Sequence, residues 1–130
     1  MSSRETDRLI STWNRVHNQS LKVMRVVPEE RMDWRPSEGM FTLRELVWHL
    51  PESELGFVRA TMAGSMQKVA LDLATSSPEE IVSVFEEQHR RLVEEVATLD
   101  EEKMNEEIEV FGKRMKRKIL LWSMTEHEIH

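Results

Sequence analysis

The chain has 130 residues, a net charge of −6 and no cysteine. This length suits one compact domain, the lack of cysteine excludes disulfides, cysteine-ligated zinc and a cysteine nucleophile, and the negative charge argues against nucleic acid as the main partner. Because no run reaches the roughly 18 to 20 apolar residues of a membrane span and the start lacks the blocks of a signal peptide, we expect a soluble cytoplasmic protein.

The first predicted element is a helix over residues 4–27. Its apolar residues recur at the spacings of three and four that place them on one helical face, and Pro28 ends the pattern. Residues 28–41 are predicted as a loop, because Arg35 precedes a proline and is therefore biased away from helical geometry.

The second predicted helix begins at Thr42 and ends at about Ala63. Thr42 and Glu45 have the spacing of a capping box, in which each side chain satisfies a backbone N–H group at the start of a helix. Gly64 is a typical residue just beyond a helix end. Pro51 lies inside this helix, where we expect it to introduce a kink.

Two further helices are predicted, over about residues 77–99 and from about residue 113 to the end. The third begins with Ser77, Pro78 and Glu80, which combine a cap, a first-turn proline and a box glutamate. Residues 100–111 are predicted as a connector with a short helical turn, and no segment alternates like a strand. Four helices joined by loops of roughly ten to fifteen residues predict an all-α four-helix bundle with crossover loops.

Five basic residues lie close together at the start of the fourth helix: Lys113, Arg114, Lys116, Arg117 and Lys118. They follow an acidic stretch over residues 100–109. The simpler interpretation is two solvated faces that offset each other, and the alternative is an anion-binding patch near a pocket.

His49 is the first candidate metal ligand, because neutral imidazole is the commonest protein ligand for divalent transition metals. It lies on an apolar helix, and Ser53, Gly56 and Ala60 follow it on the same face. These small side chains either leave room for a pocket beside the imidazole or allow close helix packing.

His127 and His130 are the other candidate ligands. Their spacing of three puts both on one helix face, where they could approach one ion. The alternative is a frayed polar end of the helix. His17 and His89 are interpreted as boundary residues that make hydrogen bonds.

Three blocks of the sequence resemble the DinB-like (DinB/YfiT) family. They are Val26-Val-Pro-Glu-Glu-Arg-Met-Asp-Trp34-Arg-Pro36, Phe41-Thr-Leu-Arg-Glu-Leu-Val-Trp-His49-Leu, and the segment from Phe111 through Glu126-His127-Glu-Ile-His130. The likeness covers nearly the whole chain, so we expect one domain over residues 1–130, truncated at its C-terminus relative to the family's pattern.

The resemblance implies a dimeric four-helix bundle in which three histidines hold a divalent ion, nickel or zinc. His49 matches the first ligand and His127 the second. The family's third ligand follows the second by four residues, whereas His130 follows it by three. Relatives of this kind include thiol-dependent S-transferases and hydrolase-like enzymes.

Two functional hypotheses follow. The first is a metal-dependent enzyme of the transferase or hydrolase type, in which the ion activates a thiol or water for attack on a small-molecule substrate. A low-molecular-weight thiol would then be a second cofactor. The alternative is a non-catalytic dimeric bundle or small-ligand-binding module with an incomplete metal site.

Overall fold

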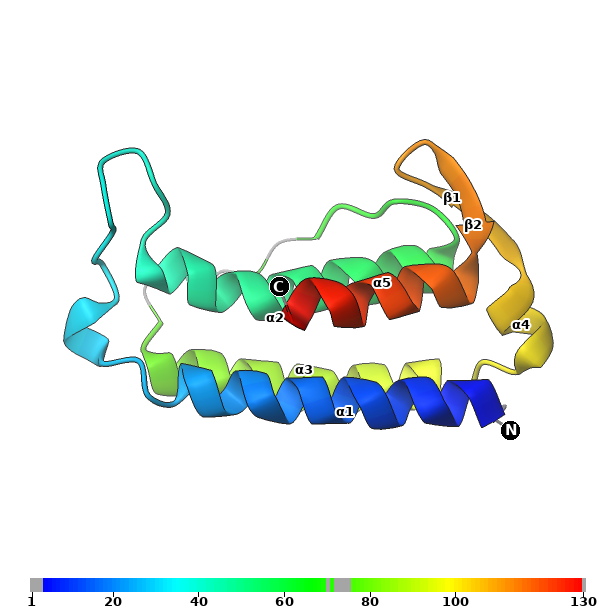
Figure 1. Ribbon diagram of the computed structural model, residues 1–130, viewed down its shortest axis with the longest axis horizontal. Coiled ribbons are helices and arrows are strands. Elements are labelled where there is room, and N and C mark those ends of the chain that lie inside the picture. The colour runs from blue at the N-terminus through cyan, green and yellow to red at the C-terminus, as the bar shows by residue number, and fades with distance from the viewer. Residues whose placement is uncertain (1–3, 70, 72–75, 130) are drawn as a thin grey trace.

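The computed structural model describes residues 4–69, 71 and 76–129, and it is a four-helix bundle (Figure 1). The long helices are α1 (Arg4–Met24), α2 (Leu43–Ala63), α3 (Pro78–Val96) and α5 (Arg117–Ile129). Shorter elements occupy the connections: the 3-10 turn η1 (Glu29–Arg31), the helix α4 (Glu101–Asn105), and the strands β1 (Glu107–Val110) and β2 (Lys113–Lys116). The predicted fold class is therefore confirmed.

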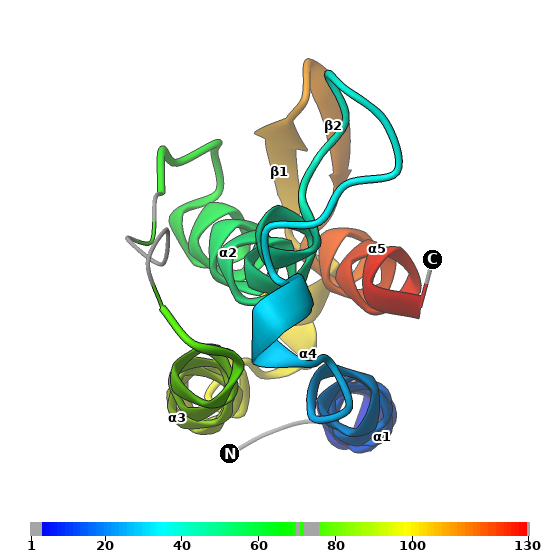
Figure 2. The ribbon, with the colours of Figure 1, turned by 90° about the vertical axis from the view of Figure 1, so that its left-hand side faces the viewer.

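The helices are not arranged around the bundle in chain order. Helix α1 packs against α3 and α5, and α2 packs against the same two helices, so α1 and α2 lie diagonally across the bundle (Figure 2). Helices α2 and α3 run in the same direction (Figure 1). The chain between these parallel neighbours must return along the bundle, which confirms the expectation of a crossover connection.

The core is built from the periodic apolar faces of the helices. Trp13 and Phe85 are its largest fully buried side chains. Trp13 lies in a cluster that also includes Leu9, Val58, Leu92 and Leu121, and thus joins all four long helices. Burying such a face against neighbouring helices is what stabilises amphipathic helices of this length.

The predicted box at Ser77 is complete, whereas at Thr42 only the threonine half of the predicted box is found among the described residues. The Thr42 side chain accepts a hydrogen bond from the Glu45 N–H group, and Ser77 and Glu80 form a reciprocal capping box. Gly64 ends α2 with a φ of 77°, in the left-handed region that favours glycine. Local sequence therefore fixed where these two helices begin and where α2 ends.

The prediction that the chain would contain no strands is wrong. Strands β1 and β2 form an antiparallel hairpin, with Ile108 opposite Met115. Phe111 and Gly112 make the turn, both at positive φ, which suits a tight two-residue hairpin turn. Phenylalanine rarely adopts positive φ, so residue preferences alone do not predict this turn.

Helix boundaries shift accordingly. Helix α5 begins at Arg117 rather than at residue 113, because β2 takes up the preceding residues. Helices α1 and α3 end at Met24 and Val96, each three residues before the predicted limit. Turn-type hydrogen bonds replace the helical pattern there, as between the Leu99 N–H and the Val96 carbonyl.

The basic cluster at the start of α5 divides into exposed and buried members. Arg114 and Lys118 form ion pairs with Glu107 and Glu5, as expected for faces that offset each other. Arg117 differs, because its side chain is buried and donates to the carbonyl groups of Thr61 and Lys103. It therefore ties the start of α5 to the end of α2.

Among the described residues, no helix is both long and apolar enough to cross a membrane.

Candidate metal centre

The structure brings His49 and His127 together from helices α2 and α5. Their Nε2 atoms are 3.3 Å apart, although the residues are separated by 78 positions in sequence. Both side chains are exposed, and the two rings meet edge to face. The third predicted ligand, His130, lies outside the described residues.

The separation of the two nitrogen atoms fits a shared ion. Two ligands of a tetrahedral zinc-like ion, each bound at about 2.0–2.1 Å, lie about 3.3 Å from each other. Without an ion, the same contact is a hydrogen bond from one ring N–H to the other ring's lone pair. A metal ion binds the lone pair of a neutral imidazole.

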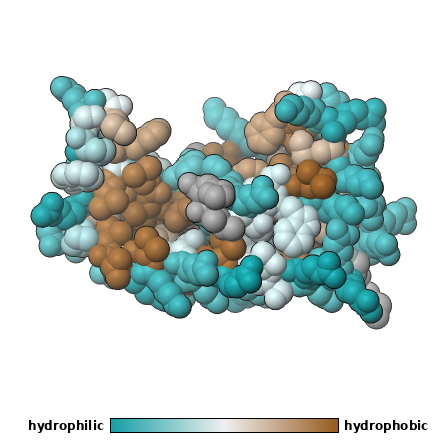
Figure 3. All heavy atoms as spheres, in the orientation of Figure 1, coloured by the Kyte–Doolittle hydropathy of each residue, from teal (hydrophilic) through white to brown (hydrophobic). Residues whose placement is uncertain are grey.

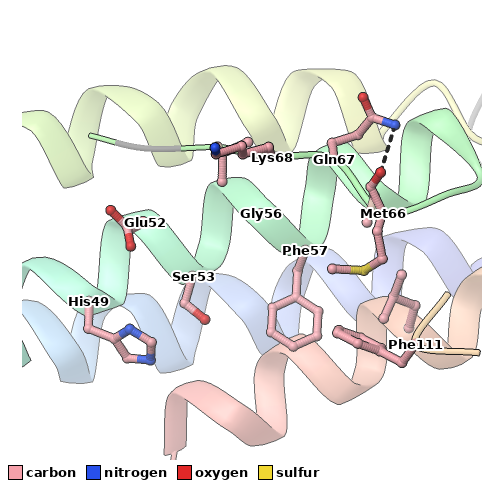
Figure 4. Close-up of a pocket in the computed structure, with 12 residues that line it drawn as sticks. His49, Glu52, Ser53, Gly56, Phe57, Met66, Gln67, Lys68 and Phe111 are labelled. Atoms are coloured by element: carbon pink, nitrogen blue, oxygen red, sulfur yellow. Dashed lines mark hydrogen bonds between the residues drawn. The ribbon is translucent and has the colours of Figure 1, made fainter. Parts of the chain in front are cut away.

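A cavity of about 310 Å³ opens beside His49 (Figure 4). Ser53, Gly56 and Ala60 line it, as the face of small residues predicted. Of the two interpretations of these residues, the pocket is confirmed. A Cβ atom added at Gly56 would lie 3.4 Å from the side chain of Val69, so the crossover chain closes over this face.

The rest of the cavity wall is mainly apolar. Phe57 extends from α2 toward α5, and its ring lies 5.6 Å from that of His127 between centroids (Figure 4). Met66 and Phe111 complete this side. Charged groups reach the cavity from Glu52 and Lys68 (Figure 4). A partly apolar small molecule with one charged group would suit such a lining.

A second polar cluster lies inside the bundle and consists of His17, Glu54 and His89. We call it the core triad. These residues come from α1, α2 and α3, and all three are buried. The Nδ1 atom of His89 lies 3.2 Å from Glu54 Oε2, and the His17 and His89 rings stack with centroids 3.7 Å apart.

Burial shifts the pKa of every member of the core triad toward its neutral form. Loss of solvation lowers the pKa of His17 to about 3, with a further contribution from His89, and lowers that of His89 to about 4. It raises the pKa of Glu54 to about 8, although hydrogen bonds from Gln88 and Trp13 act in the opposite direction. At neutral pH the metal-free triad therefore holds a protonated carboxyl group and two neutral imidazoles.

Glu128 lies between the two clusters. With Glu54 and His127 it lines a narrow recess. Burial raises its pKa to about 7, helped by the charge of Glu54 and opposed by a hydrogen bond with Ser20. Its Oε1 atom is buried without a hydrogen-bond partner. The other glutamate beside His127, Glu126, is exposed.

The core triad was not predicted as a site from the sequence. His17 and His89 were interpreted as boundary residues, and Glu54 was not singled out. A signal was present, because Glu54 lies on the buried α2 face defined by Val47, Pro51, Val58 and Thr61. A carboxylate at a core position of a helix requires a partner, and here that partner is a histidine from another helix.

The fold is shared with several solved structures. The DinB-like protein YjoA from Bacillus subtilis has 22% sequence identity and a TM-score of 0.76, over 95% of this chain and 82% of its own. YfiT from Bacillus subtilis, described as a probable metal-dependent hydrolase with an unusual four-helix bundle topology, has 17% identity and a TM-score of 0.79, over 100% and 83%. A variant of the mycothiol-dependent maleylpyruvate isomerase has 13% identity and a TM-score of 0.67, over 95% and 59%.

Such low identities establish the fold alone. No functionally curated protein is significantly similar to the chain in sequence. The family model described as the DinB superfamily matches residues 12–130, which is most of the sequence. Together with the bundle and its histidines, this match establishes that the chain belongs to the DinB superfamily.

Proposed function

We propose that this protein is a divalent-metal-dependent enzyme of the transferase or hydrolase type. The observation that carries the proposal is the 3.3 Å separation of the His49 and His127 Nε2 atoms beside a cavity of about 310 Å³. His49, His127 and His130 are the proposed ligands, and nickel or zinc suits an imidazole donor set. A bound ion of this kind supplies Lewis-acid activation of a coordinated water or thiol.

Similar proteins support this choice of chemistry. YfiT is described as a probable metal-dependent hydrolase, and the isomerase is described as mycothiol-dependent. For this chain we accordingly propose either water or a low-molecular-weight thiol as the nucleophile. The absence of cysteine from the sequence agrees with a thiol that comes from a small molecule.

The residues around the cavity have distinct proposed tasks. Gly56 and Ala60 leave space for the substrate, and Phe57 and Met66 exclude water from its apolar part. Lys68 gives the lining a positive charge that would attract an anionic group on the substrate. Held in this way, an electrophilic atom of the substrate would lie close to the histidine pair.

Metal content is the first test. Protein purified without an affinity tag and reloaded with nickel or zinc at neutral pH should retain close to one ion per chain at the histidine pair, as measured by elemental analysis. His49→Ala should lose this ion. Leu46→Ala, an exposed position one turn earlier on α2, should keep it. Equal metal retention by His49→Ala and Leu46→Ala would contradict the proposed ligand.

Activity is the second test. The reloaded protein should consume an electrophile in a panel of esters, amides and activated alkenes, with and without added thiol. His127→Gln should lower kcat/KM by at least about 100-fold, whereas the exposed neighbour Glu126→Gln should leave it within about threefold. Tight binding of small molecules in the cavity without turnover of any would favour the alternative, a non-catalytic ligand-binding module.

A further inference from the structure

The hydrogen bonds of the core triad leave two acceptor atoms, one on His89 and one on Glu54, facing each other. His89 Nε2 lies 2.7 Å from Asn14 Oδ1, an acceptor, so this nitrogen carries the ring proton. The other nitrogen of a neutral imidazole, Nδ1, then presents a lone pair to Glu54 Oε2 at 3.2 Å. Trp13 already donates to the same oxygen. Either a proton or a cation must therefore lie between Glu54 and His89.

A third donor atom of the triad has no partner. His17 Nδ1 is buried and makes no hydrogen bond. One ligand atom from each of the three residues lies within 4.8 Å of the other two. The distance of 3.2 Å between Glu54 and His89 matches two ligands of one tetrahedral ion, which lie about 3.3 Å apart.

The surrounding charges also favour a cation. Among the described residues, no lysine or arginine forms an ion pair with Glu54, and the His89 ring beside it is neutral. Glu128 brings a second carboxyl group near Glu54, and its Oε1 atom is buried without a partner. A buried carboxyl group, a half-buried one and two buried imidazoles come from all four long helices, and helix bundles hold metals in donor-rich interiors of this kind.

From these observations we propose that the core triad of His17, Glu54 and His89 is a second, structural site for a transition-metal ion of the zinc type. Two imidazoles and one carboxylate suit zinc, cobalt or nickel, whereas magnesium and calcium prefer oxygen ligands alone. The ion takes the place of the proton that Glu54 holds in the metal-free protein. Because it lies inside the bundle, it links α1, α2 and α3 and is independent of the exposed histidine pair.

Binding of a metal ion to the core triad requires the His17 ring to move. The His17 and His89 rings are stacked with an interplanar angle of 4°, so one ion cannot lie in both ring planes. His17 must turn about its side-chain bonds. Its Nδ1 atom has no hydrogen bond to break, and the turn disturbs the ring stack with His89 and the edge contact with Phe85.

The test uses a chain that lacks the exposed site. The triple variant His49→Ala, His127→Ala and His130→Ala is unfolded in guanidinium, refolded with one equivalent of cobalt(II) or zinc, and dialysed. It should retain about one ion per chain by elemental analysis, and cobalt should show the intense visible bands of a four- or five-coordinate site. In that background His17→Gln, Glu54→Gln and His89→Gln should each lower metal retention at least tenfold, while Asn18→Ala, an exposed neighbour of His17, should not.

Several outcomes would overturn the proposal. The triple variant could refold to a helical protein that retains no metal, or the three triad variants could retain as much as Asn18→Ala. If the triad variants of this background do not refold, the intact chain supplies the measurement: wild type should hold one more ion per chain than Glu54→Gln. The triple variant lacks all three proposed ligands of the enzyme's metal site. A negative result with it would therefore overturn the second site and leave the proposed function unaffected.

Discussion

Glu54 illustrates how a single buried residue makes stability depend on pH. Its raised pKa means that the folded chain keeps a proton that the unfolded chain loses above the ordinary glutamate pKa of 4.5. Its contribution to stability is therefore present below pH 4.5 and is lost as pH rises toward about 8. Glu128 behaves in the same way, up to a pH of about 7.

His17 and His89 act in the opposite direction. Their lowered pKa values mean that the unfolded chain binds protons that the folded chain does not. Their contribution is present above pH 6.5 and is lost as pH falls toward about 3 and 4. Between pH 4.5 and 6.5 the buried acids and imidazoles offset each other, so stability should be greatest in that interval.

The first prediction separates these effects. Between pH 7 and 8 the main change comes from Glu54, because Glu128 already loses half its proton at its pKa of about 7. Metal-free wild type should therefore lose on the order of 1 kcal/mol of unfolding free energy in this interval. Glu54→Gln should show only the smaller loss that Glu128 causes. Urea denaturation in the presence of a chelator measures both, and a parallel decline in the two proteins would contradict the assignment.

At the scale of single elements, the N-terminus of α3 depends on its capping box. Ser77 Oγ accepts from the Glu80 N–H group, and Glu80 accepts from the Ser77 N–H group. Ser77→Ala leaves a backbone donor without its partner and should cost about 1 kcal/mol of unfolding free energy. Ser77→Asp serves as the control, since aspartate also caps helices and should restore most of the loss. Equal losses in both variants would show that the cap is not the cause.

The start of α5 depends on a buried cation. Arg117 donates to the carbonyl groups of Thr61 and Lys103 and forms an ion pair with Glu106. This arrangement satisfies a carbonyl group at the end of α2 that has no helical partner. It also lowers the pKa of Glu106.

Arg117→Met should therefore destabilise the protein strongly. Methionine cannot donate, so two backbone carbonyl groups lose their hydrogen bonds from a charged side chain. We expect this loss to lower the unfolding free energy by about 3 kcal/mol. Lys113→Met changes the same kind of charge at an exposed position of the hairpin and should stay within about 0.5 kcal/mol of wild type. Thermal and urea unfolding monitored by circular dichroism compare the two, and similar losses would contradict a specific role for Arg117.

At the scale of the whole molecule, the surface predicts self-association. Beyond the end of α2, Met66 and Val69 line the cavity, and Leu71 packs against the core. Apolar side chains gather at the opposite end, over the end of α1 and the start of α2 (Figure 3). Exposed members of this end are Val23, Val26, Met40, Phe41 and Leu46.

We predict that the protein is a homodimer with two-fold symmetry, because exposed apolar groups of this size are usually covered by a partner surface. Light scattering at micromolar concentration should give twice the mass of one chain, which is 15.4 kDa. Leu46→Glu should shift the mass toward that of one chain, and Glu126→Lys should not. A monomeric mass that persists on concentration would contradict the prediction.

Local chemistry in the sequence determined the helices of this protein. The caps at Thr42 and Ser77, the stop at Gly64 and the apolar periodicity are properties of neighbouring residues, so they could be predicted before any tertiary contact was known. The small residues along the His49 face indicated either a pocket or close helix packing, and the structure shows the pocket. The hairpin was not predicted because its turn needs Phe111 at positive φ. Phenylalanine does not favour this geometry by itself, and strand pairing in the hairpin stabilises it.

Only the tertiary structure decided which side chains meet. The diagonal placement of α1 and α2 lets α2 contact both α3 and α5, so that Glu54 meets His89 on one side while His49 meets His127 on the other. Periodicity tells which residues of a helix face inward, but not which partner helix they face. That choice depends on the order and direction of the helices around the bundle, which the long crossover connections leave open and which packing of the whole core determines.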